Sequence, residues 1–202
     1  MGNANLYSLN SSYSLKITET DMNKRTLFIA RISIILALTL VIQMAGFPQP
    51  ITGPLINTML FITASLFGTL TGVILGSLTP LVALIRGQLP PILAPMVVFI
   101  IGGNAILVLT YNVIVKSWEN FSGKTSTKMS QIVGILVASV AKFVFLTFAV
   151  RIFLPVIFNV SIGEKFAFLM TTPQLITAIL GGIIAVIILT FLNRQANHQL
   201  VH

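Results

Sequence analysis

The sequence has no cysteine, which excludes disulfides, thiolate catalysis and thiolate metal sites. Acidic side chains are also scarce, with four Asp and Glu residues among 202. Both histidines, His198 and His202, lie at the C-terminal end. With so few carboxylates and imidazoles, we predict no metal site, no catalytic residue and no cofactor.

Charge of either sign is rare as well. Charged residues make up 8% of the chain, against about 25% in a typical soluble domain. Hydrophobic residues make up 55%, which is more apolar surface than a soluble core of this size can bury. We therefore predict an all-α integral membrane protein. The net charge of +8 does not indicate nucleic-acid binding, because the Lys and Arg residues flank apolar spans as membrane topology requires.

Six apolar spans are predicted. The first follows Lys24-Arg25, and its length of about 20 residues is enough for a helix to cross a bilayer. The second is short, which predicts a tilted or re-entrant segment. The spans cover residues 27–46, 55–67, 68–85, 92–115, 131–153 and 173–192. They predict a polar cytoplasmic tail at 1–26, a six-helix membrane domain at 27–194 and a cytoplasmic tail at 195–202.

The joints between the spans differ in character. Residues 47–54 are proline-rich and are predicted to interrupt the helix. Residues 116–130 form the longest polar joint, and residues 154–172 form a semi-polar connector. Pro173 then begins the last span, and proline is tolerated in the first turn of a helix.

Small residues predict close helix packing in spans three and six, at Gly68, Gly72, Gly76, Ala178, Gly181, Gly182 and Ala185.

Basic residues predict the orientation. Six spans place both termini on one side, and the side richer in Lys and Arg is normally the cytoplasm. Eight basic residues then lie inside: Lys16, Lys24, Arg25, Arg31, Lys116, Lys124, Lys128 and Arg194. Three lie outside: Arg86, Arg151 and Lys165. The bias predicts that both the N-terminus and the C-terminus are cytoplasmic.

Polar side chains inside apolar spans are costly in a membrane and are therefore the candidates for a binding site. Lys142 lies near the middle of the fifth span, and Asn104 near the middle of the fourth. Arg86 ends the third span, while Gln43 and Asn57 lie near the outer ends of spans one and two. We predict that these five residues line a cavity open to the outside.

Each candidate also has a purely structural interpretation. Lys142 can be a structural cation bonded to helix carbonyls, and Asn104 can bond a neighbouring helix. Arg86 can be an anchor at the membrane interface. Gln43 and Asn57 can serve packing or headgroup contact. The sequence leaves these alternatives open.

The chain has no visible source of energy for transport. No acidic residue lies inside a span, whereas ion-coupled transporters usually carry an embedded carboxylate or a dense oxygen site. No Gly-Lys-Ser/Thr phosphate-binding loop is present either. Such a protein can bind a solute, but it needs a partner to drive the movement of that solute.

Three features together resemble a known family. These are the small-residue face of Ala30, Ser33 and Ala37, the proline-rich joint at 48–54, and the run Thr79-Pro80…Arg86-Gly87…Pro90-Pro91…Ala94-Pro95…Gly103-Asn104. With six short spans in about 200 residues, the chain resembles the substrate-binding S components of energy-coupling factor transporters. The resemblance covers residues 27–194.

The resemblance implies a vitamin, a vitamin precursor or a similar micronutrient as the ligand, bound in the outer half of the bundle. It implies a membrane coupling subunit and two ATP-binding cassette ATPases as partners, with Ala30, Ser33 and Ala37 facing the coupling subunit. It also implies a bacterial or archaeal cell membrane. Ordinary helix packing inside the chain is the alternative use of this small-residue face.

Other functions remain open. A membrane scaffold of the rod-shape-determining type also has small hydrophobic spans, although it has no need of Lys142 or Asn104 at mid-depth. A membrane enzyme needs an embedded acid, histidine or nucleophile with a partner, and none is visible. The basic residues favour an acidic or phosphate-bearing ligand, and a neutral nucleoside-like precursor is the alternative.

Overall fold

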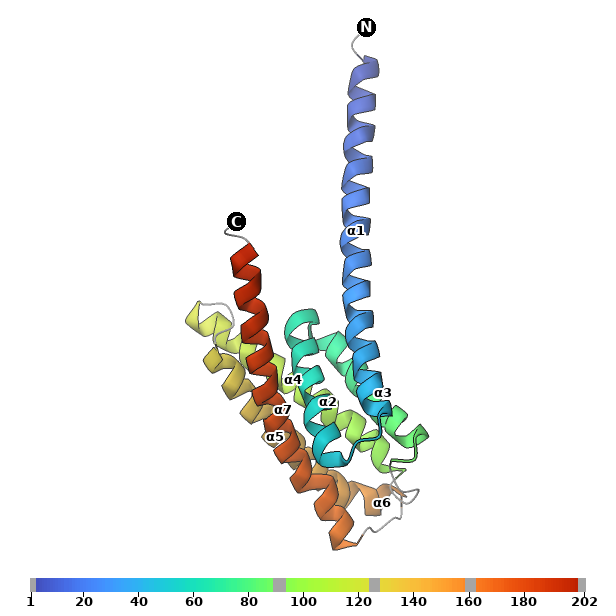
Figure 1. Ribbon diagram of the computed structural model, residues 1–202, viewed down its shortest axis with the longest axis vertical. Coiled ribbons are helices and arrows are strands. Elements are labelled where there is room, and N and C mark those ends of the chain that lie inside the picture. The colour runs from blue at the N-terminus through green and yellow to red at the C-terminus, as the bar shows by residue number, and fades with distance from the viewer. Residues whose placement is uncertain (1–2, 89–93, 124–127, 159–162, 200–202) are drawn as a thin grey trace. The chain divides into compact units, whose positions relative to one another are not determined.

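The computed structural model describes residues 3–88, 94–123, 128–158 and 163–199, and every regular element in these ranges is helical (Figure 1). Five segments are long and apolar enough to cross a membrane: Asn23–Met44, Gln49–Phe67, Met96–Ser122, Lys128–Phe158 and Met170–Gln195. A further apolar helix, α3 (Thr69–Ile85), is shorter. The described part of the chain is therefore all-helical, and it is consistent with a multi-pass membrane protein.

Helix α1 (Asn3–Met44) continues through most of the region predicted as a polar tail. The boundary predicted near residue 26 is thus a change in composition and not the start of a helix. The predicted first span ended at Gly46, whereas the helix ends two residues earlier. Gly46 has φ +74°, a left-handed conformation that glycine adopts without the steric cost of a Cβ atom.

Two compact units divide the chain, Met1–Ala37 and Leu38–His202. In the second unit, five helices pack in a closed ring: α2 (Gln49–Phe67), α3, α4 (Met96–Ser122), α5 (Lys128–Phe148) and α7 (Glu164–Gln199). Each helix of the ring contacts the next, α7 contacts α2, and α2 also contacts α4. Side chains from several helices can therefore meet inside the ring.

Two predicted helix starts were wrong. Helix α2 begins at Gln49, so it has 19 residues, and the predicted short second span is not observed. Pro50 lies in the first turn, where the missing N–H has no helical acceptor to lose. Helix α7 begins at Glu164, nine residues before the predicted start, so Pro173 lies inside it.

The polar joints are also shorter than predicted. Helix α4 continues to Ser122, beyond the predicted end at Val115. A π-helical turn, η2 (Ala149–Phe153), and the short α6 (Leu154–Phe158) follow α5 directly, so much of the predicted connector is helical. Hydropathy identifies only the apolar part of a helix. The predicted ends were too early because these helices continue into polar residues. Pro90 and Pro91 lie outside the described residues.

The small-residue face predicted for the last span is confirmed. All four of its members are buried on α7: Ala178, Gly181, Gly182 and Ala185. A Cβ atom added at Gly181 would lie 2.5 Å from the carbonyl oxygen of Pro54 on α2. Helices α2 and α7 thus approach each other closely at a position that requires glycine.

The glycines of the third span divide between two roles. A Cβ atom at Gly72 would lie 2.9 Å from Val108, and one at Gly76 would lie 3.0 Å from Cβ of Asn104, so both glycines bring α3 close to α4. Gly68 instead lies between α2 and α3 with φ +87°. The predicted face therefore has two members in the helix, and Gly68 forms the turn before it.

Large apolar side chains are exposed on the outer faces of the ring helices. Val113 on α4, Val140 on α5 and Ile187 on α7 have exposed fractions of 59%, 51% and 65%. Exposed apolar surface on this scale is unfavourable in water and favourable in hydrocarbon. Large apolar side chains thus face outward around the ring, as expected in lipid, while several polar side chains are buried among apolar ones inside.

Candidate functional site

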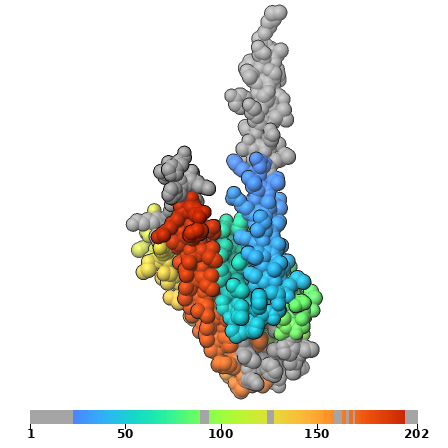
Figure 2. Space-filling view, in the orientation of Figure 1, coloured from blue at the N-terminus to red at the C-terminus, as the bar shows by residue number. Residues whose placement is uncertain are grey.

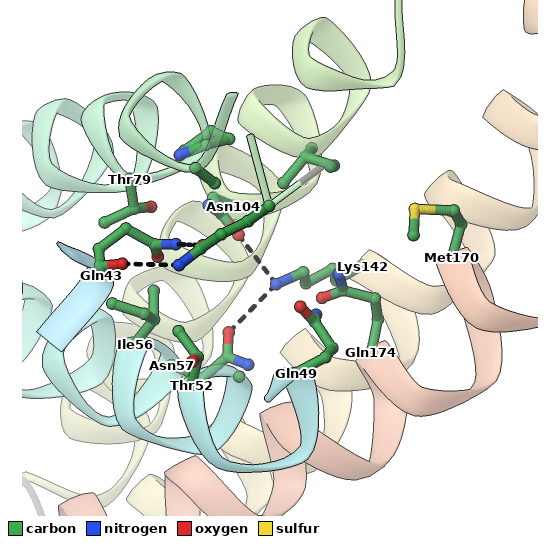
Figure 3. A pocket seen from close by; sticks show the side chains of 15 residues that line it. Gln43, Gln49, Thr52, Ile56, Asn57, Thr79, Asn104, Lys142, Met170 and Gln174 are labelled. Atoms are coloured by element: carbon green, nitrogen blue, oxygen red, sulfur yellow. Dashed lines mark hydrogen bonds between the residues drawn. The ribbon is translucent and has the colours of Figure 1, made fainter. Parts of the chain in front are cut away.

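A partly open cavity of about 80 Å³ lies inside the ring (Figure 3). It is lined by the end of α1, by α2, α3, α4, α5 and α7, and by Gln88 after α3. Its polar lining consists of Gln43, Gln49, Thr52, Asn57, Thr79, Gln88, Asn104, Lys142 and Gln174. Four of the five residues predicted from the sequence are among them: Gln43, Asn57, Asn104 and Lys142.

Lys142 is the central side chain of the site. It lies close to the middle of Lys128–Phe158, a segment long and apolar enough to cross a membrane, and its residue is only 2% exposed. Its Nζ donates hydrogen bonds to Oδ1 of Asn104 at 2.8 Å and to Oδ1 of Asn57 at 3.1 Å. Two asparagines, one from α2 and one from α4, thus converge on the ammonium group that Lys142 extends from α5 (Figure 3).

Both asparagines are fixed by further hydrogen bonds. Nδ2 of Asn104 donates to the carbonyl oxygen of Gly76 at 2.8 Å, and Nδ2 of Asn57 donates to Oγ1 of Thr177 at 3.4 Å. A carboxamide whose NH₂ is held by an acceptor turns its oxygen the opposite way. The oxygens of Asn57 and Asn104 are therefore aimed at Lys142, and these asparagines act chiefly to position the lysine.

The positive charge of Lys142 is not balanced inside the protein. Among the described residues no carboxylate forms an ion pair with it. Glu164 pairs instead with Arg151 at 3.8 Å, and both of these side chains are largely exposed, so that contact contributes little. An ammonium group has three N–H donors, and the asparagines accept two of them. One donor of a deeply buried cation is left for a group in the cavity.

Two glutamines beside Lys142 were missed in the sequence. Gln174 on α7 is buried, with 7% exposure, and its side chain makes no hydrogen bond to the described residues. Gln49, at the start of α2, is exposed, and both carboxamides point toward Lys142 (Figure 3). Gln174 could have been suspected, because it begins the last apolar span and a buried amide needs a hydrogen-bond partner.

A glutamine pair forms another part of the wall. Nε2 of Gln43 donates to Oε1 of Gln88 at 2.6 Å, and Nε2 of Gln88 donates to the backbone oxygen of Gln43 at 3.0 Å. The pair joins the end of α1 to the turn after α3. Gln43 was predicted as a site residue, whereas Gln88 was not.

Arg86 does not line the cavity. It caps the C-terminal end of α3 and is exposed. A Cβ atom at Gly46 would lie 3.4 Å from Nη2 of Arg86, so the guanidinium lies beside the turn that follows α1. Of the five predicted residues, Arg86 is the one that the structure does not bring to the others.

The predicted docking residues Ala30, Ser33 and Ala37 are all exposed on α1. They lie three and four residues apart and so share one side of the helix. Small residues on one face of a helix permit close approach by another helix. Whether this face of α1 binds a coupling subunit stays a prediction.

The chemistry of the cavity is that of hydrogen bonding around one cation. No group of three or more His, Cys, Asp or Glu side chains in the described ranges could hold a metal ion. Carboxamides both donate and accept, and the ammonium donates. The lining can therefore bind a polar solute that offers an acceptor to Lys142 and mixed hydrogen-bonding groups to the glutamines.

No protein-family model, no curated protein and no solved structure matches this chain in comparisons with known proteins.

Proposed function

We propose that this chain is the membrane-embedded binding subunit of an uptake system for a vitamin or vitamin precursor. In this proposal it resides in a bacterial or archaeal cell membrane as an S-component-like bundle. It crosses the membrane six times, because the shorter α3 crosses it in addition to the five longer segments. Both termini lie in the cytoplasm. A separate coupling subunit and two ATPases supply the energy.

The observation that carries the proposal is the buried Lys142 with one uncommitted donor in a polar cavity. An unpaired charge at the centre of a bilayer costs at least about 2.5 kcal/mol on insertion scales. Two amide oxygens offset part of this cost, and an acceptor on a ligand offsets more. A scaffold gains nothing from such a group, whereas a binding protein uses it for affinity and selectivity.

The ligand is expected to meet Lys142 and Gln174 directly, with Gln49 at its exposed side. Asn57 and Asn104 hold the lysine in place from behind. A carboxylate or phosphate oxygen, or a carbonyl of a neutral ligand, fits the free ammonium donor. Ligand pockets commonly have volumes of about 300–1,000 Å³. The present cavity is smaller, so we propose that it receives the polar end of the ligand or widens on binding.

The test of this function separates binding from transport. We expect solutes that bind the purified chain to raise its unfolding temperature, yet not to accumulate in liposomes that lack the coupling subunit and ATPases. In cells with the complete system, Ala37→Leu is expected to reduce uptake while leaving affinity largely intact, because the larger side chain blocks close helix contact.

Two controls complete this test. Leu38→Ala changes an exposed neighbour of Ala37 and is expected to spare uptake. A chain that no solute stabilises against heat would instead be a scaffold. Full uptake by the isolated chain in liposomes would rule out dependence on ATPase partners.

The orientation has its own test. Single cysteines at Ser122, the last residue of α4, and at Gly163, before α7, are expected to react with an impermeant thiol reagent from opposite sides of the membrane. The chain has no native cysteine to interfere. Reaction of both positions from the same side contradicts the proposed topology.

A further inference from the structure

A second hollow lies apart from the Lys142 cavity, between the start of α5 and the end of α7. This groove has a volume of about 350 Å³. Its lining consists of Lys128, Val186, Ile187, Thr190, Phe191 and Arg194. In the space-filling view, the red end of α7 lies beside the yellow region where α4 ends and α5 begins (Figure 2).

The floor of the groove is apolar and accessible. Ile187 and Phe191 are 65% and 60% exposed, and they lie one helical turn apart on α7. Both belong to the membrane-crossing segment Met170–Gln195. A surface of this kind in a bilayer contacts hydrocarbon, so an acyl chain is its natural occupant.

The rim of the groove is cationic. Lys128 is the first residue of one membrane-crossing segment, and Arg194 is the penultimate residue of another. Because both line one groove, they lie at the same membrane surface. Both are exposed, and neither forms an ion pair with a described carboxylate. Thr190 adds a hydroxyl one turn inside Arg194.

We propose that this groove binds one anionic phospholipid, with its phosphate between Lys128 and Arg194 and an acyl chain against Ile187 and Phe191. Arginine matches phosphate oxygens with paired N–H donors, and lysine adds a point charge. Basic pockets between membrane helices recognise anionic headgroups in this way. A zwitterionic headgroup brings its own cation near the two basic residues and so fits less well.

Lipid retention by the full-length chain tests the proposal. After reconstitution in equal amounts of phosphatidylglycerol and phosphatidylcholine, native mass spectrometry is expected to find one phosphatidylglycerol held preferentially. Lys128→Gln combined with Arg194→Gln is expected to weaken this retention about tenfold or more, since the phosphate loses both cations that line the groove. The matched control, Arg25→Gln with Lys116→Gln, also removes one arginine and one lysine and is expected to retain the lipid.

A variant that fills the groove distinguishes lipid binding in the groove from general attraction of the lipid to surface charge. Ile187→Trp leaves both cations in place and occupies the floor, so it too is expected to lower phosphatidylglycerol retention. Equal retention of the two lipids by the unmodified chain overturns the proposal. So does an equal loss in the control pair, which indicates general electrostatics, or unchanged retention in Ile187→Trp, which indicates headgroup attraction without a groove.

Discussion

Replacing Lys142 with methionine is expected to lower the affinity for the ligand about tenfold or more. A hydrogen bond to a charged group contributes about 1.5–3 kcal/mol, and 1.4 kcal/mol corresponds to a factor of ten. Methionine is similar in length to lysine and fills much of the same space, but it donates no hydrogen bond. Titration of the purified chain with a ligand identified by thermal stabilisation gives the affinity directly.

The loss has a second physical cause. Without Lys142, Oδ1 of Asn57 and Oδ1 of Asn104 lose the donor that the protein supplies. The two asparagine side chains are then no longer held in one orientation at the cavity. Lys116→Met removes the same charge from an exposed position in the C-terminal half of α4 and should leave affinity unchanged. Arg86→Gln should lower affinity less than Lys142→Met, because Arg86 is exposed and its charge is screened by water and salt.

Folding has to be checked beside affinity, since Lys142 is buried. If Lys142→Met unfolds at the temperature of the unmodified chain and binds the ligand with the same affinity, the lysine is purely structural. The proposal that the ligand carries an anionic group or another hydrogen-bond acceptor then loses its support. Gln174→Leu provides an independent test, because the Gln174 side chain makes no hydrogen bond to the described residues. Its backbone oxygen, which accepts from Oγ1 of Thr177, stays in place, so the substitution should weaken binding without removing a hydrogen bond between described residues.

Gly181→Ala is expected to destabilise the protein by about 1–3 kcal/mol, the usual cost of overpacking. The added Cβ atom would lie 2.5 Å from the carbonyl oxygen of Pro54 and 2.9 Å from the backbone nitrogen of Thr58. Backbone atoms cannot rotate away as a side chain can, so α2 and α7 must separate. Thermal unfolding of the purified chain in detergent measures the change in stability.

The same substitution should also reduce ligand affinity. The new Cβ atom would lie 2.8 Å from Cβ of Asn57, whose oxygen accepts from Lys142. Gly163→Ala is the matched control, because a Cβ atom there meets nothing within 4 Å and the residue has no positive φ. Identical unfolding temperatures for the two variants would contradict the close packing of α2 against α7.

The membrane character of the chain could be predicted because hydropathy is a local property. Each apolar segment prefers lipid whatever its neighbours are, so composition alone identified most of the helices that are apolar enough to cross a membrane. Helix ends were predicted less well, at Gln49, Ser122 and Glu164, because polar residues and prolines can occupy helix termini that hydropathy does not mark. The six crossings and their orientation stay predictions.

Two features of the site could be predicted from patterns along one segment: Lys142 has no acid within its span, and the last span carries a small-residue face. Which polar residues meet could not be predicted in this way, because it depends on the packing of several helices. Whether Asn57, Asn104 and Gln174 converge on Lys142, while Arg86 stays outside, depends on how each helix rotates about its axis and how closely it approaches its neighbours. Those quantities are set by contacts between helices, such as Gly76 against Asn104 and Gly181 against Pro54, which no single segment contains.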